Sequence, residues 1–266
     1  MLSTNLTVIV PTLNSHNILC DLVHSFKIQT LKSWEVIFVD GNSEYSHLLY
    51  LKNICKNDKR FKWIKQSKTS KGIFGAMNDG NQSVDPNNWI LYLGSDDKLA
   101  NKYALSKLKS ELDKSLKKKN HFDVLFCRCR YTKKGILGRK SYFSLSSGEK
   151  IYSNKEINKS LFYGSTPPHQ GVIVGPKARK KLPNFSDRYR IASDLDYLLQ
   201  ISLYKDLKFK SIKLELILCA SEGISHKQTY RRIYEVIKIY FKRYKFLFFI
   251  SFFTRYIRRI VSKFYK

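Results

Sequence analysis

The sequence predicts an α/β fold, with a mostly parallel β-sheet flanked by helices and a basic helical extension at the C-terminus. Short apolar runs alternate with helical patterns through the first part of the chain, and the residues from Lys227 onward are helical, aromatic and basic. Apolar strands that are separated by helices are typical of a parallel sheet covered on both faces. The 266 residues hold one large domain of this kind, or one domain with a helical appendage.

Strands and helices are predicted in alternation along the chain. The first predicted strands span 6–10, 34–40, 61–66 and 89–93, and the first predicted helices span 18–30, 45–57, 72–83 and 103–118. Further strands are predicted over 124–131, over 171–174 and within 207–219, and a further helix over 192–204. The Lys-, Gly- and Ser-rich region between 131 and 171 is expected to contain a hairpin or a mobile loop.

The charge of the chain predicts a surface that attracts anions. Lys and Arg number 49 against 21 Asp and Glu, which gives a formal net charge of +28. Nucleic acid, an anionic membrane face and phosphorylated small molecules are the partners that such a surface suits. The apolar share of 43% excludes a wholly disordered chain.

The five cysteines show no spacing typical of a metal site. There is no CxxC pair, and Cys127 and Cys129 alternate with Arg128 and Arg130, so both thiols are expected on one face of a strand. We therefore expect free, buried thiols in a reducing compartment.

No segment of the sequence predicts export or a membrane span. The apolar run 6–10 is too short for a signal peptide, and the run 246–253 falls far short of the roughly 20 residues that cross a bilayer. These features predict a cytoplasmic protein.

Acidic residues follow two of the predicted strands. Asp40 ends the strand 34–40, and Asp96 and Asp97 follow the strand 89–93. Ligands of parallel sheets bind outside the carboxyl ends of the strands. Asp40 could accept hydrogen bonds from a nucleobase or a ribose, or it could form an Asx-turn or a helix cap. The adjacent pair suits a divalent metal that bridges to a diphosphate, or again a helix cap.

Four motifs occur in order around these acids. They are Thr7-Val-Ile-Val-Pro-Thr-Leu-Asn14, Val36-Ile-Phe-Val-Asp-Gly-Asn-Ser43, Gly72-Ile-Phe-Gly-Ala-Met-Asn-Asp-Gly80 and Leu91-Tyr-Leu-Gly-Ser-Asp-Asp97. Together they resemble the nucleotide-sugar-binding half of the inverting enzymes of glycosyltransferase family 2. The resemblance is strong over 7–99 and continues weakly to Gly223.

The resemblance implies a GT-A-like fold with a Rossmann-type sheet. It implies an enzyme that moves a sugar from a nucleotide-diphosphate sugar, in particular a UDP-sugar, to an acceptor, with a divalent metal (Mn²⁺ or Mg²⁺) held by Asp96 and Asp97. The donor-binding residues that it implies are Pro11, Thr12, Asn14, Asp40, Lys71, Gly72, Met77, Asn78, Ser95 and Asp96. Many members carry further acids where this chain has Ser70, Gly75 and Gly94, which leaves sugar specificity open.

Two later motifs extend the resemblance. Asp194 and Asp196 lie in the first turn of the helix 192–204, where the helix dipole also favours acids. By the resemblance one carboxylate here deprotonates the acceptor hydroxyl, and we assign Asp194 as this base, with Asp196 in reserve. His169 and Gln170 precede the strand 171–174 and by the same resemblance contact the acceptor or the donor phosphate. A structural imidazole in a turn is the other interpretation.

The residues after His226 form a basic amphipathic pattern in which Glu235 is the only acid. Such patterns lie in membrane interfaces. We therefore expect peripheral docking on the inner face of the plasma membrane, where glycan or lipid-linked acceptors of bacterial surface polysaccharide (O-antigen, capsule or similar) are glycosylated. A helix that packs on the domain is the alternative. The predicted boundaries are a glycosyltransferase domain at 1–225, with a nucleotide-sugar-binding half at 1–100 and an acceptor-binding half at 101–225, and a tail at 226–266.

Other classes of protein remain as alternatives. A basic nucleic-acid-binding protein would suit the charge, but no helix-turn-helix, zinc finger or RNA-binding sheet signature is present, and no nucleic acid partner is expected. A nucleotidyltransferase would need a Gly-rich loop after its first strand, where this chain has Pro11-Thr-Leu-Asn14. A catalytically inactive scaffold of the same fold stays open.

Overall fold

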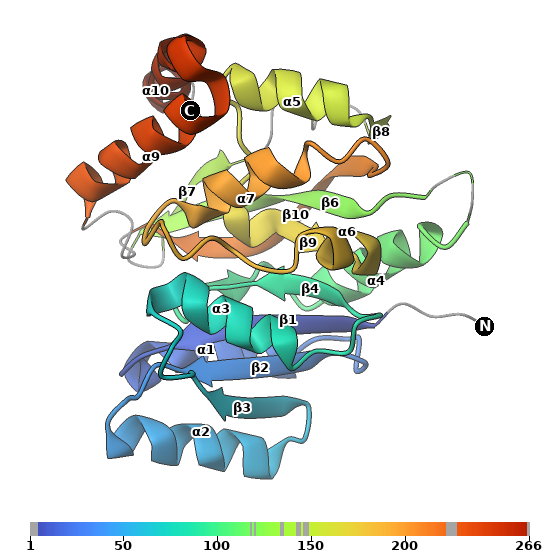
Figure 1. Cartoon of the computed structure of the whole chain (residues 1–266). Coiled ribbons are helices and arrows are strands. Elements are labelled where there is room, and N and C mark those ends of the chain that lie inside the picture. Colours follow the sequence, from blue (N-terminus) through green and yellow to red (C-terminus); the bar gives the residue numbers. More distant parts are fainter. Residues whose placement is uncertain are drawn as a thin grey trace.

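One mixed β-sheet runs through the molecule, with the strand order β3-β2-β1-β4-β9-β6-β10-β5 (Figure 1). The computed structural model describes residues 5–117, 119, 121–133, 136–141, 145, 149–221 and 228–264. Its strands are β1 (Leu6–Thr12), β2 (Glu35–Asp40), β3 (Phe61–Lys65), β4 (Trp89–Tyr92), β5 (Lys98–Leu99), β6 (Val124–Lys133), β7 (Ile136–Ser141), β8 (Ile151–Tyr152), β9 (Val172–Val174) and β10 (Phe209–Ala220).

The helices cover both faces of this sheet. They are α1 (His16–Lys27), α2 (Tyr45–Asn57), α3 (Gly72–Gln82), α4 (Ala104–Lys114), α5 (Asn154–Phe162), α6 (Pro176–Lys181), α7 (Ser193–Ile201), α9 (Thr229–Tyr244) and α10 (Phe248–Phe264), with short 3₁₀ turns at His169–Gly171 and Lys245–Leu247. Figure 1 shows α3, α6 and α7 in front of the sheet and α1 and α4 behind it.

The first four long strands form the parallel part of the sheet. β3, β2, β1 and β4 are mutually parallel, and β6 is parallel to β10. Between these two groups lies β9, which is antiparallel to both β4 and β6. The predicted α/β fold with a mostly parallel sheet is therefore confirmed, and β9 is where the chain direction reverses. The predicted hairpin is β6–β7, whose strands pair antiparallel.

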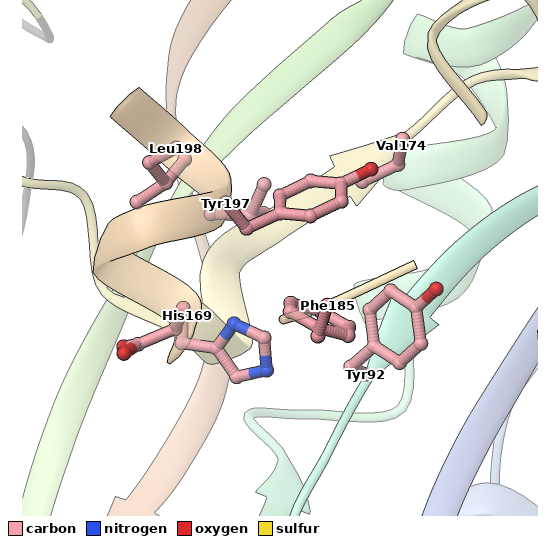
Figure 2. A pocket seen from close by; sticks show the side chains of 8 residues that line it. Tyr92, His169, Val174, Phe185, Tyr197 and Leu198 are labelled. Atoms are coloured by element: carbon pink, nitrogen blue, oxygen red, sulfur yellow. The ribbon is translucent and has the colours of Figure 1, made fainter. Parts of the chain in front are cut away.

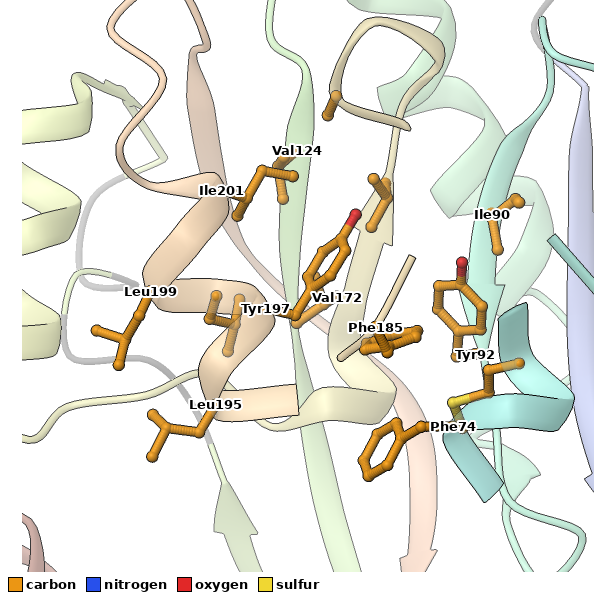
Figure 3. Close-up of a cluster of buried hydrophobic side chains, with 14 of the residues drawn as sticks. Phe74, Ile90, Tyr92, Val124, Val172, Phe185, Leu195, Tyr197, Leu199 and Ile201 are labelled. Atoms are coloured by element: carbon orange, nitrogen blue, oxygen red, sulfur yellow. The ribbon is translucent and has the colours of Figure 1, made fainter. Parts of the chain in front are cut away.

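Residues of each central strand alternate between two apolar cores because successive side chains of a strand point to opposite faces. Val8 and Val10 of β1 join the core beneath α1, α2 and α4, whereas Ile9 joins the core beneath α3 and α7. Figure 3 shows part of this second core, in which Tyr92 and Phe185 lie between strand and helix. The two cores fix the carboxyl ends of β1, β2 and β4 along one edge.

The second core continues into the C-terminal region. Val236, Ile239 and Tyr240 of α9 are buried in it together with residues of α7. The change of composition near residue 225 is therefore not the end of the packed core. The predicted helical extension is present as α9 and α10. α9 is buried in the core, and Phe248 and Phe252 of α10 pack against the same core.

The five thiols are free, and Cys127, Cys129 and Cys219 are buried as expected. The expectation of burial is wrong for Cys20, which is exposed, and Cys55 is only partly buried. Among the residues that the structure describes, no helix is both long and apolar enough to cross a bilayer.

Candidate active site

The loops after β1 and β2 are joined to each other at the carboxyl edge of the sheet. Asn14 adopts a left-handed backbone conformation (φ 48°), accepts a hydrogen bond from Glu44 N through its Oδ1, and donates its own backbone N–H to Ser43 Oγ. Gly41 N donates to Thr12 O at 2.8 Å. These bonds place two of the predicted donor-binding residues, Thr12 and Asn14, beside the end of β2.

Asp40 forms the Asx-turn that its sequence position allowed, and one of its carboxylate oxygens stays without a donor. Its Oδ2 accepts hydrogen bonds from Asn42 N and Ser43 N, both at 3.1 Å, which is an Asx-turn. Its Oδ1 is buried and accepts no hydrogen bond from any described residue. Oγ1 of Thr12, at the end of the neighbouring strand β1, is likewise buried and without a hydrogen-bond partner. A buried acceptor without a donor is unfavourable. The arrangement therefore leaves Oδ1 available for a ligand N–H or O–H.

His47 lies behind this carboxylate. Its Nε2 is 3.7 Å from Asp40 Oδ1, beyond hydrogen-bond distance, and the side chain is fully buried. Burial lowers the pKa of His47, and His16 lowers it further, against the opposite effect of Asp40. A neutral imidazole thus borders the Asp40 carboxylate. His47 was not predicted as a site residue.

Asp79 orders the loop between β3 and α3. Its carboxylate accepts hydrogen bonds from Ser67 N at 2.7 Å and from Ser70 Oγ at 2.6 Å. This loop leads to Lys71 and Gly72, two of the predicted donor-binding residues, which are both exposed. Asp79 belongs to a motif that we quoted, yet its role as the anchor of this loop was missed.

Two other predicted donor-binding residues have structural contacts. Met77 is buried in the second core. Asn78 donates from Nδ2 to Phe185 O at 3.0 Å and accepts from Phe185 N at 2.8 Å. Contact of either residue with the donor stays a prediction.

The acidic pair after β4 has one buried and one exposed member. Asp97 is 2% exposed, and its Oδ2 accepts a hydrogen bond from Gly94 N at 2.7 Å. Asp96 is exposed and follows the partly buried Ser95. A Cβ at position 94 would lie 2.6 Å from Asp96 Oδ1 and 3.2 Å from Asp97 Oδ2. The missing side chain of Gly94 thus lets both carboxylates approach the end of β4.

Two neighbouring negative charges at this position repel each other, and a bound cation would neutralise them. Burial, and then repulsion from Asp96, raise the pKa of Asp97 to about 7. Partial desolvation by the surrounding protein raises the pKa of Asp96, although much of that residue is exposed. Mg²⁺ is usually bound by one or two carboxylates together with substrate phosphates and water. The pair therefore fits a divalent cation that also binds the substrate phosphates. Among the described residues, no group of three or more Asp, Glu, His or Cys side chains is arranged to hold a metal ion.

His169 and Asp194 line the same small cavity. About 10 Å³ in volume, it lies between β4, β9 and α7, and Figure 2 shows His169 and Tyr197 at its wall with Tyr92 across from them. The His169 ring stacks on Tyr92, with 6.0 Å between the ring centroids. Burial lowers the pKa of His169, and the Asp194 carboxylate acts in the opposite direction. The neighbouring Gln170 lies close enough to Asp97 for its side chain to lower the pKa of that carboxyl, which relates this cavity to the acidic pair.

The two acids of α7 lie in different surroundings. Asp196 is 4% exposed, its Oδ2 accepts from Gln200 Nε2 at 2.6 Å, and burial raises its pKa. Asp194 is partly exposed and belongs to the cavity with His169. Of the two, Asp194 is the carboxylate that faces the other predicted site residues.

A cleft of about 510 Å³ opens beside the same edge. One wall comes from the loops after β2 and β3, and the other from the segment before α7 and the start of α9. Its lining residues are Gly41, Gln66, Ser70, Lys71, Gly72, Phe74, Asp187, Arg188, Tyr189, Arg190 and Arg231.

Glu235 connects α9 to the segment that leads into α7. This buried carboxylate accepts hydrogen bonds from Arg190 N at 3.0 Å, Ile191 N at 2.8 Å and Ala192 N at 3.0 Å, and from Arg231 Nε at 3.1 Å. Burial alone would raise the pKa of Glu235, but these donors hold it below its ordinary value. The role of Glu235 was missed, although its isolation among basic residues was a visible signal.

The sequence has relatives among glycosyltransferases. The family described as "Glycosyl transferase family 2" matches residues 7–167. The GalNAc(5)-diNAcBac-PP-undecaprenol beta-1,3-glucosyltransferase of Campylobacter jejuni is 25% identical over 205 residues, which are 77% of this chain and 61% of the relative. A PGL/p-HBAD biosynthesis glycosyltransferase of Mycobacterium bovis is 33% identical over 93 residues, 35% of this chain and 36% of the relative. The chain thus spans less than two thirds of each relative.

Solved structures share the fold. S. aureus TarS 1-349 in complex with UDP-GlcNAc superimposes with a TM-score of 0.68 at 20% identity, over 89% of this chain and 66% of that one. The mannosyltransferase PcManGT from Pyrobaculum calidifontis, in complex with GDP-Man and Mn²⁺, superimposes with a TM-score of 0.63 at 12% identity, over 96% of this chain and 70% of that one.

The sheet, its acidic carboxyl edge and these neighbours define the class as the GT-A fold of glycosyltransferases. The sequence match settles the particular family, because it covers more than half of the chain. The protein belongs to glycosyl transferase family 2.

Proposed function

We propose that the protein is an inverting glycosyltransferase that moves a sugar from a nucleotide-diphosphate sugar, in particular a UDP-sugar, to a glycan or lipid-linked acceptor of bacterial surface polysaccharide. The observation that supports the proposal is the cavity shared by Asp194 and His169, whose neighbour Gln170 lies close to Asp97 of the acidic pair. The names of the relatives support the substrate classes, since one acts on an undecaprenol-linked glycan and a structural neighbour binds UDP-GlcNAc.

The donor binds along the ends of β1, β2 and β4. Asp40 Oδ1, the unpartnered buried acceptor, receives a hydrogen bond from the base or the ribose, with Pro11 and Thr12 beside it. Residues 1–100 form this donor half, and residues 101–225 the acceptor half. The remaining donor contacts are assigned to Asn14, Lys71, Gly72, Met77, Asn78, Ser95 and Asp96.

The leaving diphosphate carries charge that must be neutralised. Asp96 and Asp97 would hold a Mn²⁺ or Mg²⁺ ion there, with Asp96 on the solvent side, and the ion would stabilise the departing nucleotide. His169 and Gln170 lie between this pair and the acceptor side, where they contact the acceptor or the phosphates.

Asp194 acts as the general base. It accepts the proton of the acceptor hydroxyl while the acceptor oxygen bonds to the anomeric carbon, and the bond from that carbon to the diphosphate oxygen breaks. A single displacement of this kind inverts the anomeric configuration. The partial exposure of Asp194 allows a hydroxyl to reach it, whereas Asp196 is buried against Gln200.

The C-terminal tail, residues 226–266, docks the enzyme peripherally on the inner face of the membrane. Phe249, Phe253, Ile257 and Ile260 are exposed along one side of α10, between 47% and 60% each. Their spacing of three and four residues places them on one helical face. An exposed apolar row beside many cations suits an anionic lipid interface.

One experiment tests the assignment of the base. Asp194→Asn should lower turnover by about 10² or more and leave the affinity for UDP nearly unchanged, because general-base catalysis contributes about 10²–10⁴. Asp196→Asn is the matched control and should retain far more turnover. EDTA should abolish transfer by the parent protein and by the Asp196→Asn variant. Full activity of Asp194→Asn, or an anomerically retained product, would overturn the proposal.

A further inference from the structure

The second wall of the 510 Å³ cleft is strongly cationic. Arg188, Arg190 and Arg231 line it, and Lys71 faces them from the donor wall, against a single lining carboxylate at Asp187. Among the described residues, no ion pair includes Lys71, Arg188 or Arg190. Arg231 does contact Glu235, but that carboxylate already accepts three backbone N–H groups. The wall therefore has an excess of positive charge.

This wall is also held in place before any ligand arrives. The three hydrogen bonds from Arg190, Ile191 and Ala192 to Glu235 fix the backbone that carries Arg188 and Arg190, and the same carboxylate orients Arg231. A site whose donors are ordered in advance loses less entropy on binding. Guanidinium groups bind phosphates with paired, charge-assisted hydrogen bonds.

The position of the wall indicates which molecule supplies the phosphate. The segment Asp187–Arg190 leads directly into α7, whose first turn carries the proposed base Asp194. The charge of the donor diphosphate is matched, in the proposed function, by the cation at Asp96 and Asp97. The arginines of the opposite wall are then left for a different anion on the acceptor side of the cleft.

We infer that Arg188, Arg190 and Arg231 form a binding site for a phosphate group of the acceptor, occupied together with the donor. The inference rests on the proposed function and names a substrate class for it: an acceptor that carries a phosphate or diphosphate close to the hydroxyl that is glycosylated.

The test uses inorganic pyrophosphate as the probe and the full chain saturated with UDP in excess Mg²⁺. Calorimetric titration should show that pyrophosphate binds without displacing UDP. The double variant Arg188→Gln/Arg190→Gln should weaken pyrophosphate at least tenfold, since each tenfold step needs only about 1.4 kcal/mol. UDP affinity should change less than about twofold because the donor contacts are intact. Lys107→Gln removes an exposed cation of α4 that does not line the cleft, and as the control it should bind pyrophosphate like the parent protein.

Three outcomes would overturn the inference. Competition between pyrophosphate and UDP would assign the arginines to the donor diphosphate. Equal weakening by Lys107→Gln would show a general charge effect. Displacement of pyrophosphate by phosphatidylglycerol vesicles would assign the wall to a lipid headgroup. Failure of the protein to bind UDP at all would instead contradict the proposed function, so the two ideas fail separately.

Discussion

The last two helices, α9 and α10, are similar in composition but contact the domain in opposite ways. Both are basic and aromatic, yet α9 buries Val236, Ile239 and Tyr240, whereas α10 buries Ser251 and Arg255. The outward side of α10 carries its apolar row, Phe249, Phe253, Ile257 and Ile260. The comparison teaches that α9 belongs to the domain core, whereas α10 packs on that core with one side and leaves an apolar row exposed, a division that composition does not reveal.

Aromatic truncation on each helix gives the largest expected contrast. Tyr240 is 0% exposed, so Tyr240→Ala should lower the free energy of unfolding by about 3–5 kcal/mol, from lost burial and the cavity that remains. Phe253 is 60% exposed, so Phe253→Ala should change it by only about 0.5 kcal/mol or less. Urea denaturation measures both, and equal effects would contradict the division of roles.

The next effect concerns the carboxylate that α9 contributes. Glu235→Gln should lower the free energy of unfolding by about 1.5–3 kcal/mol, since an amide cannot accept from all of its charged and backbone donors. The pKa of Glu235 is lower in the folded protein, so its stabilisation is present above the unfolded pKa and is lost as the pH falls through the folded one. The difference between the two proteins should therefore shrink below a pH of about 4.3. A difference that does not vary with pH would refute this account.

The apolar row of α10 should matter for lipid and not for folding. Phe253→Asp should weaken binding to anionic vesicles at least tenfold, a loss of about 1.4 kcal/mol, since it removes one buried aromatic contact and adds a repelled charge. Tyr234→Asp, at an exposed position of α9, is the matched control. Vesicle sedimentation measures both variants. Unchanged vesicle binding by Phe253→Asp would show that α10 does not dock on the membrane.

The last prediction concerns the effect of salt on the same binding. Each cation near an anionic leaflet contributes about 1 kcal/mol, and the Debye length falls to about 3 Å at 1 M salt. Raising the salt should therefore weaken vesicle binding of the intact protein, while the apolar row retains part of it. Sedimentation in low and high salt measures this, and binding that is fully insensitive to salt would contradict an electrostatic contribution.

Local patterns in the sequence predicted the donor half of the fold well. The predicted helix 45–57 is α2, and the predicted strands 34–40 and 61–66 differ from β2 and β3 by one residue at an end. The short strands β5 and β8 were not predicted because they exist through pairing with β10, far away in the chain. The helix α5 was also missed, although Ser153 and Glu156 form a capping box that the sequence displays.

The candidate site divides in the same manner. Asp40, Asp96 and Asp97 follow predicted strands, so the topology of a parallel sheet was enough to place them on one edge. Glu235 contacts backbone atoms of Arg190 from a helix 45 residues further along the chain, and no local pattern encodes that meeting. Such contacts depend on how the elements pack, which motif spacing does not describe.

The hydrogen bonds that Glu235 accepts from the segment before α7 have a consequence for shortened forms of the protein. A chain truncated between residues 202 and 234 would keep every motif between residues 7 and 97 and the whole family match, which ends at residue 167. Such a protein would still match the family, but the segment that leads to Asp194 would lack its hydrogen bonds to Glu235. A single acid within the basic tail therefore holds the segment beside Asp194, although it lies outside every motif of the donor half.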